Sequence, residues 1–322
     1  MSGLVVNAVG GPEAMEWSDA PVGDPGPGQL KLRHKAIGLN FVDIYQRDGT
    51  YKVQTPFVPG NEGAGEVIAV GAGVTDFKSG DRVAYSGVMG AYAEERLISA
   101  ERCVHVPDGV DMETAAAVML KGTTAYYLLF ETYALRAGDT ILFHAAAGGM
   151  GQIACQWAKA IGARVIGTAG SAEKVELAKT FGCDAVINYK QEDFVARVRE
   201  LTGGRGVDVV YDGVGRDTFE GSLDCLRPRG LMVSFGNASG TVAIPNLGIL
   251  AAKGSLYVTR PTGASYFAKP EDYRIAATAV FEVVKSGAVK VGINARYPLR
   301  DAARAHRALE NRETTGSVIL TP

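Results

Sequence analysis

Three small residues, spaced Ala146-x-Gly148-x-x-Gly151, could hold a pyrophosphate against the backbone. They lie between an apolar segment, 140–144, that is typical of a strand and a segment, 149–161, with the period of a helix. The first turn of such a helix presents unpaired N–H groups and the positive end of its dipole to an anion, and small residues let phosphates come close. The spacing alone also fits an ordinary strand-to-helix turn. With both flanking elements present, the pattern indicates a dinucleotide-binding corner in which Ala replaces the first glycine.

The end of the next strand indicates which dinucleotide would bind. Folds that bind NAD usually place Asp or Glu there, about 20 residues after the glycines, to hold the ribose 2′-hydroxyl. The segment 166–171 contains no acidic residue, and Lys174 follows at the start of the next helix with Ser171 beside it. A lysine is most often simply solvated, so the missing acid is the stronger indication. These residues suit a 2′-phosphate, and the sequence predicts NADPH rather than NADH.

The elements that must position these residues alternate regularly between strand and helix. The alternation extends from 140 to 259, and its strands are continuous apolar runs. Such strands are buried on both faces, as in a doubly wound parallel sheet covered by helices. The predicted strands are 140–144, 164–168, 185–188, 207–211, 230–235 and 255–259, and the predicted helices are 149–161, 172–181, 192–201, 217–226 and 247–252.

The rest of the chain is β-rich near the N-terminus and mixed near the C-terminus. Short strands bounded by Gly and Pro are predicted at 4–8, 29–39, 63–70, 82–85, 91–97 and 103–106, with a helix at 40–47. After 261 come helices at 271–286 and 301–311 and a last strand at 316–320. A single strand is not stable alone, so we expect it to rejoin the N-terminal sheet. The sequence predicts an α/β protein of two domains, a discontinuous one (1–122 and 262–322) and a dinucleotide-binding one (123–261).

Composition excludes several classes of protein. The 322 residues carry a formal net charge of −2, which gives no electrostatic attraction to nucleic acid or to an anionic membrane. No apolar run approaches the ~20 residues that span a bilayer, and the N-terminal sequence lacks the pattern of a secretory signal. The four cysteines are scattered, which argues against a disulfide framework or a zinc ribbon. We therefore expect a cytoplasmic protein with reduced cysteines.

The segment 138–159 resembles the signature of a known enzyme family. Its pattern, Gly-Asp-x-x-Leu-x-x-x-Ala-Ala-Gly-Gly-x-Gly-x-x-x-x-Gln-x-x-Lys, is similar to that of the zeta-crystallin-like NADPH:quinone oxidoreductases, in the zinc-independent branch of the medium-chain dehydrogenase/reductase superfamily. The resemblance extends from end to end, is greatest to the bacterial members, and includes the stretches 38–45, 59–65, 80–83, 90–93, 233–237 and 254–260. It implies a GroES-like catalytic domain and a Rossmann domain, in agreement with the predicted limits.

The zinc ligands of related alcohol dehydrogenases have no counterpart in this sequence. Those relatives carry His after the Pro-Gly of the stretch 59–65, where this chain has Asn61, and a cysteine-rich lobe where it has only Cys103. A catalytic zinc needs about three protein ligands. The four His and four Cys are scattered, so the sequence predicts no metal site. His144, inside a strand, is predicted to be a hydrogen-bonded core residue rather than a ligand.

The resemblance also implies which residues form the site. Asn40, Asp43, Tyr45 and Tyr51 would line a cleft at the nicotinamide and the substrate, and Asn40 and Tyr45 would also contact the cofactor. From the residues alone, Tyr45 and Tyr51 also fit packing aromatics, and Asp43 fits a capping or solvated residue. The other residues implied to bind the cofactor are Tyr127, Gly149, Met150, Gly170, Ser171, Lys174, Tyr189, Val214, Phe235, Gly236, Asn237, Ala238, Val258, Thr259, Arg260 and Ser317.

Hydride transfer from NADPH to a quinone is the activity that the resemblance implies. Resonance places the new charge on oxygen, where solvent can protonate it, so the protein mainly has to orient the reactants. A hydrogen bond from Tyr45 or Asn40 could stabilise that charge. The nearest alternative is reduction of an α,β-unsaturated carbonyl, an enone or enoyl compound, with the same cofactor. A nucleotide-bound structural or RNA-binding protein is the alternative from another class, disfavoured by the near-neutral charge.

The strand predicted at 255–259 is the last of the sheet and therefore an edge. Natural proteins pair or cover such edges. Antiparallel pairing with a second copy would do so, and the resemblance implies the same arrangement. The sequence predicts a homodimer.

Overall fold

The computed structural model describes residues 2–322, which form two compact units. Unit 1 contains the residues up to Thr123 with Phe267–Lys285 and Val291–Pro322, and unit 2 contains Thr124–Tyr266 with Ser286–Lys290. These limits differ from the predicted domain limits at 262–266 and 286–290, which belong to unit 2, and at Thr123, which belongs to unit 1. That the units serve as a catalytic and a cofactor-binding domain stays a prediction. Among the described residues, no helix is long and apolar enough to cross a membrane.

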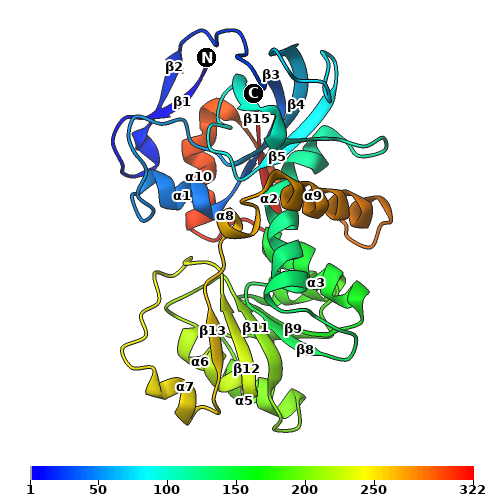
Figure 1. Ribbon diagram of the computed structural model, residues 1–322. Helices are drawn as coiled ribbons and strands as arrows, with labels where there is room; N and C mark the ends of the chain where they lie inside the picture. The colour runs from blue at the N-terminus through cyan, green and yellow to red at the C-terminus, as the bar shows by residue number, and fades with distance from the viewer. Residues whose placement is uncertain (1) are drawn as a thin grey trace. The chain divides into compact units, whose positions relative to one another are not determined.

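Unit 2 is built on a six-stranded parallel sheet in the order β10-β9-β8-β11-β12-β13 (Figure 1). The strands are β8 (Thr140–Phe143), β9 (Arg164–Ala169), β10 (Ala185–Asn188), β11 (Val207–Asp212), β12 (Leu226–Ser234) and β13 (Tyr257–Thr259). The helices are α3 (Gly149–Ile161), α4 (Ala172–Thr180), α5 (Phe194–Leu201), α6 (Phe219–Cys225), α7 (Gly248–Ala252) and α8 (Gly263–Tyr266). The predicted alternation and its parallel strands are confirmed.

The apolar strands of this sheet form the core of unit 2, as their sequences predict. Leu142, Ile166 and Val210 come from three strands of the sheet and have no exposed surface. Helices cover the sheet, so apolar side chains on both faces of a strand are removed from water. Gly162 ends α3 in the left-handed region, with φ of 96°, where a glycine is favoured.

Unit 1 is built on a mostly antiparallel sheet in the order β14-β15-β3-β4-β5-β7, with β6 paired to β3. The strands are β3 (Gln29–Leu39), β4 (Glu62–Val70), β5 (Arg82–Ser86), β6 (Glu95–Ser99), β7 (Cys103–His105), β14 (Ile293–Pro298) and β15 (Ser317–Thr321). β15 pairs with β3, Val318 lying opposite Leu39, which confirms that the C-terminal strand rejoins the N-terminal sheet. β6 begins four residues later than predicted, because the loop before it hydrogen-bonds to β1. In that loop, the carbonyl oxygen of Tyr92 accepts from the N–H of Leu4 at 2.8 Å.

A hairpin and several helices complete unit 1. The hairpin joins β1 (Ser2–Val6) to β2 (Met15–Asp19), and the sequence does not predict β2 because its segment, MEWSD, contains only two apolar residues. The helices are α1 (Phe41–Arg47), α9 (Pro270–Lys285), α10 (Ala302–Glu310) and most of α2 (Met112–Tyr126), and short 3₁₀ turns lie at Pro12–Ala14, Ala100–Arg102 and Leu299–Asp301. α2 continues in unit 2 as a π-helical turn, η3 (Tyr127–Thr132).

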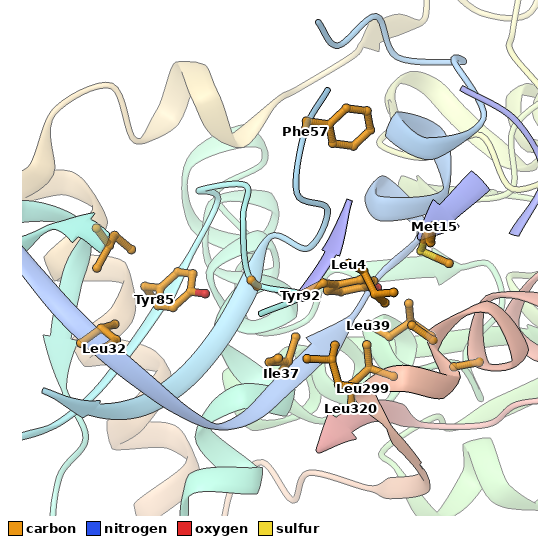
Figure 2. Packing of buried hydrophobic residues seen from close by; sticks show 14 of the residues in the cluster. Leu4, Met15, Leu32, Ile37, Leu39, Phe57, Tyr85, Tyr92, Leu299 and Leu320 are labelled. Carbon is orange, nitrogen blue, oxygen red and sulfur yellow. The ribbon is translucent and has the colours of Figure 1, made fainter. Parts of the chain in front are cut away.

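The core of unit 1 brings residues from both ends of the chain together (Figure 2). Leu4 and Leu39 pack in one cluster with Tyr92, Leu299 and Leu320. These side chains are at most 4% exposed. Burying a Leu side chain contributes about 1.5–3 kcal/mol, so this cluster holds the C-terminal residues against β3.

Candidate cofactor and active site

The turn between β8 and α3 has the form that a dinucleotide needs. α3 begins at Gly149 with Gly148 as its N-cap, so the N–H groups of its first turn have no partner within the helix. A Cβ on Gly151 would lie 2.5 Å from the carbonyl oxygen of Ala146, so only glycine lets the helix pack this close to the strand. Ala146 is fully buried, and a Cβ on Gly167 of β9 would lie 2.7 Å from its methyl group. Ala can replace the first glycine here because Gly167 leaves room for it.

His144 follows β8 and is a hydrogen-bonded core residue, as predicted. Its Nδ1 lies 3.0 Å from Thr168 Oγ1 and its Nε2 lies 2.9 Å from Ser222 Oγ, while burial lowers its pKa. Ser222 in turn donates to Asp212 Oδ2 at 3.0 Å. The buried Asp212 also accepts from the N–H of Val214 at 2.7 Å. Asp212 therefore fixes the loop that carries a predicted cofactor residue, and sequence reasoning missed it.

The residues predicted to bind a 2′-phosphate lie at the end of β9 and the start of α4. Ser171 is the N-cap of α4, and its Oγ accepts from the N–H of Lys174 at 3.3 Å. The hydroxyl of Tyr189 lies against Gly170, where a Cβ would be 2.5 Å from it. Gly170, Ser171 and Lys174 are partly exposed and Tyr189 is 42% exposed, so the four residues share a solvent-accessible corner of the sheet that has no acid at the strand end.

The predicted cofactor residues after β12 and β13 form a hydrogen-bonded cluster. Arg260 donates through Nη1 to the carbonyl oxygen of Ser234 at 2.7 Å. With its carboxamide oriented to satisfy both neighbours, Asn237 accepts from Arg260 Nη2 at 3.1 Å and donates to the Gly236 carbonyl at 2.9 Å. Open parallel sheets bind ligands at this carboxyl end of the strands. The same end carries the half-buried residues Met150, Val214, Phe235, Ala238, Val258 and Thr259.

Two predicted cofactor residues are almost completely buried. Tyr127, on the π-helical turn, is 5% exposed and stacks on Tyr266, with ring centroids 4.5 Å apart and planes 13° apart. Thr132 of the same turn donates to the Tyr266 hydroxyl at 2.8 Å, which fixes that ring. Ser317 is 1% exposed, and its Oγ donates to the Ala117 carbonyl at 3.1 Å. The Ser317 hydroxyl therefore has a partner within unit 1, and its contact with a cofactor stays a prediction.

In unit 1, the four predicted catalytic residues lie on α1, at its start or in the loop after it. Asn40 is the N-cap of α1 and is 7% exposed. Tyr45 and Tyr51 meet edge to face, with ring centroids 5.1 Å apart, and the N–H of Tyr51 donates to the Tyr45 carbonyl at 2.7 Å. The loop is thus tied to the helix, and it brings these two hydroxyl-bearing side chains together.

Asp43 is a buried, hydrogen-bonded residue, and its predicted place at the site stays a prediction. Its carboxylate is fully buried and accepts from the N–H of Asn40 at 2.9 Å, from Asn61 Nδ2 at 2.7 Å and from the Tyr92 hydroxyl at 3.2 Å. Burial raises the pKa of Asp43 to about 6, although these hydrogen bonds oppose the rise. Asp43 therefore completes the capping box of α1 and holds Asn61.

Glu62 and Lys121 form a buried ion pair that sequence reasoning missed. Lys121 Nζ lies 3.3 Å from Glu62 Oε2, and Lys121 is 8% and Glu62 0% exposed. Glu62 also accepts from Asn40 Nδ2 at 2.7 Å. The sequence does contain a signal for this pair, since Glu62 begins a strand rich in Gly, Ala and Val. A carboxylate that is buried with such a strand needs partners.

No group of three His, Cys, Asp or Glu side chains within residues 2–322 is placed to hold a metal ion. Asn61, at the position where zinc-dependent relatives carry His, donates to Asp43 and, at 2.6 Å, to Gln46 Oε1. An amide bonded to two neighbours therefore occupies this position. The four cysteines are buried free thiols: Cys103, Cys155, Cys183 and Cys225.

Comparisons with known proteins agree with this geometry. Residues 26–108 match the model of the alcohol dehydrogenase GroES-like domain, and residues 149–281 match that of the zinc-binding dehydrogenases. Quinone oxidoreductase of Pseudomonas aeruginosa is 55% identical over 98% of each chain. Quinone oxidoreductase 1 of Escherichia coli is 50% identical over 97% of each chain. A 2-haloacrylate reductase of Burkholderia is 45% identical over 99% of this chain and 98% of its own.

Solved structures show the same fold. A quinone oxidoreductase of Pseudomonas syringae has a TM-score of 0.97 at 52% identity, covering 100% of this chain and 99% of its own. The Escherichia coli quinone oxidoreductase complexed with NADPH has a TM-score of 0.97 at 48% identity, covering 100% of both chains. A GroES-like fold with a Rossmann-type sheet defines the medium-chain dehydrogenases and reductases, as predicted. Within that class, the chain belongs to the quinone oxidoreductase family.

Proposed function

We propose that this protein reduces quinones by hydride transfer from NADPH and needs no metal ion to do so. The observation that carries the proposal is the end of β9, where residues 166–171 contain no acid and Ser171 caps α4, whose first turn carries Lys174 beside Glu173. A carboxylate there would repel a 2′-phosphate, whereas a lysine and the N-terminus of a helix attract it. The quinone oxidoreductase names of the relatives and the NADPH in the Escherichia coli structure support the same activity.

The residues of unit 2 fit the parts of this cofactor. The unpaired N–H groups at the start of α3, with Gly149 and Met150, would bind the pyrophosphate, and Gly151 lets them approach it. The strand ends around Asn237 and Arg260 would hold the nicotinamide end. When bound, NADPH supplies the hydride from its nicotinamide ring. The task of the chain is to orient that ring and keep water from it.

Tyr45 is the side chain that we assign to the substrate oxygen. A quinone gains negative charge on oxygen as it is reduced, and a hydroxyl hydrogen bond would stabilise that charge. Asn40 does not fit this role, because its Nδ2 donates to Glu62 at 2.7 Å and faces the Gly38 carbonyl at 3.5 Å. In the sequence, Tyr45 and Asn40 are equally possible donors to the substrate oxygen, and we assign that role to Tyr45 alone.

Lys174→Ala tests the proposed cofactor. Loss of a charge-assisted hydrogen bond costs about 1.5–3 kcal/mol, so the KM for NADPH is expected to rise about 10- to 100-fold while that for NADH hardly changes. Lys179→Ala is the matched control, since Lys179 lies on the same helix and pairs with Glu176 at 2.7 Å. Equal effects of Lys174→Ala on both cofactors would refute the assignment of the 2′-phosphate.

Reduction of an α,β-unsaturated carbonyl is a second candidate, favoured by the 45% identity to 2-haloacrylate reductase. The two reactions need the same hydride donor but different acceptors. Measuring kcat/KM with NADPH and a naphthoquinone or 2-chloroacrylate separates them. We expect the naphthoquinone to be preferred at least tenfold, and the reverse order would assign the second activity.

We further propose that two copies pair through β13, and that the protein acts in the cytoplasm. β13 is an edge of the six-stranded sheet, and its Tyr257 is 61% exposed. Leu247, just before α7, is 70% exposed. Proteins usually pair or cover such an edge. Light scattering is expected to give the mass of a dimer for the wild type and of a monomer for Tyr257→Lys, and a wild-type monomer at micromolar concentration would refute the pairing.

A further inference from the structure

The buried carboxylate of Glu62 receives only hydrogen-bond donors. Glu62 is the first residue of β4, and its Oε1 accepts from the N–H of Leu120 at 2.7 Å. Its Oε2 accepts from Lys121 Nζ at 3.3 Å and from Asn40 Nδ2 at 2.7 Å. A Cβ on Gly38 would collide with Oε2, so this position of β3 has to be glycine for the carboxylate to lie there. The carboxylate is therefore built into the sheet.

This carboxylate decides which way the Asn40 carboxamide faces. An ionised carboxylate can only accept, so Asn40 must turn its NH₂ group toward Glu62. The same orientation places Nδ2 toward the Gly38 carbonyl, at 3.5 Å, and Oδ1 toward the N–H of Asp43 in the capping box of α1. Oδ1 keeps a second lone pair. The group that Asn40 can offer to a ligand is therefore an acceptor.

An acceptor at Asn40 distinguishes the cofactor from the substrate. A quinone carries only acceptor oxygens, whereas the nicotinamide riboside carries donors, the carboxamide NH₂ and the ribose hydroxyls. We propose that Glu62 is a positioning residue that fixes the polarity of Asn40, so that Asn40 Oδ1 binds a donor of the nicotinamide riboside. The proposal assumes the NADPH-dependent function proposed above. Lys121 keeps the negative charge of Glu62 paired, and Asp43 holds the helix turn that Asn40 caps.

Glu62→Gln tests this role without changing the size of the side chain. The introduced carboxamide can satisfy either the Leu120 N–H or the Asn40 NH₂ group, but not both, because one of its two ends is a donor. If its oxygen stays on Leu120, Asn40 must turn its own NH₂ group outward. We expect the Kd for NADPH to rise about 10- to 100-fold, as for loss of a hydrogen bond in a buried polar network. The Kd for 2′,5′-ADP, which lacks the nicotinamide riboside, is expected to stay within threefold of the wild type.

The exchanged pair Asn40→Asp with Glu62→Gln is the rescue experiment. The new carboxylate at the N-cap accepts both from the new carboxamide on β4 and from the N–H of Asp43. It also supplies the charge that Lys121 needs and again offers an acceptor to the ligand. We expect the pair to restore the NADPH Kd to within threefold of the wild type, whereas Asn40→Asp alone places two carboxylates at hydrogen-bond distance and does not. Glu95→Gln is the matched control, because Glu95 of the same sheet pairs with the exposed Arg33.

Calorimetric titrations with NADPH and 2′,5′-ADP separate the outcomes. An unchanged NADPH Kd in Glu62→Gln overturns the proposal, and so does an equal loss of both ligands. If Glu62→Gln does not fold in a thermal melt, the exchanged pair is measured instead, and NADPH affinity more than tenfold below the wild type overturns the proposal. Failure of the wild type to bind either ligand contradicts the proposed cofactor itself, which is a different result.

Discussion

The stability of unit 1 is expected to depend on the buried imidazole of His306 in α10. Its Nδ1 accepts from Arg47 Nη1 at 3.2 Å, and its Nε2 donates to the Tyr92 hydroxyl at 2.9 Å. That hydroxyl donates to Asp43 Oδ2 at 3.2 Å, so every proton in the chain of bonds is directed toward the carboxylate. Burial, and then the charge of Arg47, lower the pKa of His306 to about 3. The imidazole is therefore neutral in the folded protein at neutral pH.

The pH dependence follows from the difference between the folded and unfolded pKa values. An unfolded His titrates near 6.5, so between about pH 6.5 and 3 the unfolded chain binds one more proton at His306. Each such proton lowers the free energy of unfolding by about 1.4 kcal/mol per pH unit as the pH falls. Burial lowers the pKa of His34 to about 4, which adds the same slope down to that pH. The pKa of Asp43 is raised to about 6, so between about pH 6 and 4 the folded protein binds more protons at Asp43 than the unfolded chain does. Its contribution to the slope of the unfolding free energy is therefore opposite in sign and offsets that of one histidine.

His306→Gln is the variant that isolates this contribution. The Gln carboxamide can accept from Arg47 and donate to Tyr92, so the hydrogen bonds are kept while the titrating group is lost. Between pH 6.5 and pH 5, roughly 1.5 pH units, the wild type loses about 1.4 kcal/mol per unit at this histidine and the variant does not. When the pH is lowered from about 7 to about 5, the free energy of unfolding of the variant is therefore expected to rise by about 2 kcal/mol relative to that of the wild type. Urea denaturation, followed by Trp17 fluorescence in a Trp157→Phe background, measures it. His105→Gln, at an exposed imidazole, is the control.

The reasoning fails if the two free-energy curves stay parallel over this range of pH. Parallel curves would mean that His306 is protonated to the same extent in the folded and unfolded chain, and that the directed series of hydrogen bonds to Asp43 is absent in solution. A constant offset between the curves would report only the packing difference between Gln and His.

Three further substitutions test the site. Gly151→Ala is expected to destabilise unit 2 by about 1–3 kcal/mol and to weaken NADPH binding, because the new methyl meets the Ala146 carbonyl; an unchanged thermal midpoint would contradict the close packing. Tyr92→Phe should cost unit 1 about 2–4 kcal/mol in urea denaturation, since Asp43 loses a donor and the His306 N–H loses its acceptor; a loss below about 1 kcal/mol argues against that network. Tyr45→Phe should lower kcat for a naphthoquinone about 10- to 100-fold while the Kd for NADPH stays the same, and a weaker Kd would assign Tyr45 to the cofactor.

The local elements could be predicted because their signals lie within short stretches of sequence. The sequence predicts α3 with the bounds that the structure has, since its apolar period, its N-terminal glycines and Gly162 are all local. The parallel strands are predictable for the same reason, each being a continuous apolar run. β2 has two apolar residues and β6 follows a loop tied to β1, so in both cases the pairing partner rather than the sequence determines the strand.

The sequence by itself determined the fold and the corner at 146–151, because strand period, helix period and glycine spacing act over a few residues. Only the tertiary structure decided the roles of the polar side chains. The buried Asp43 is bonded by Tyr92, which His306 bonds in turn, and both are distant from it in sequence. Ala146 is tolerated because Gly167 lies on the neighbouring strand. Asn40 and Tyr45 are both possible donors in the sequence. The carboxylate of Glu62 makes Asn40 an acceptor toward a ligand, since a buried charge imposes one orientation on the amide that contacts it.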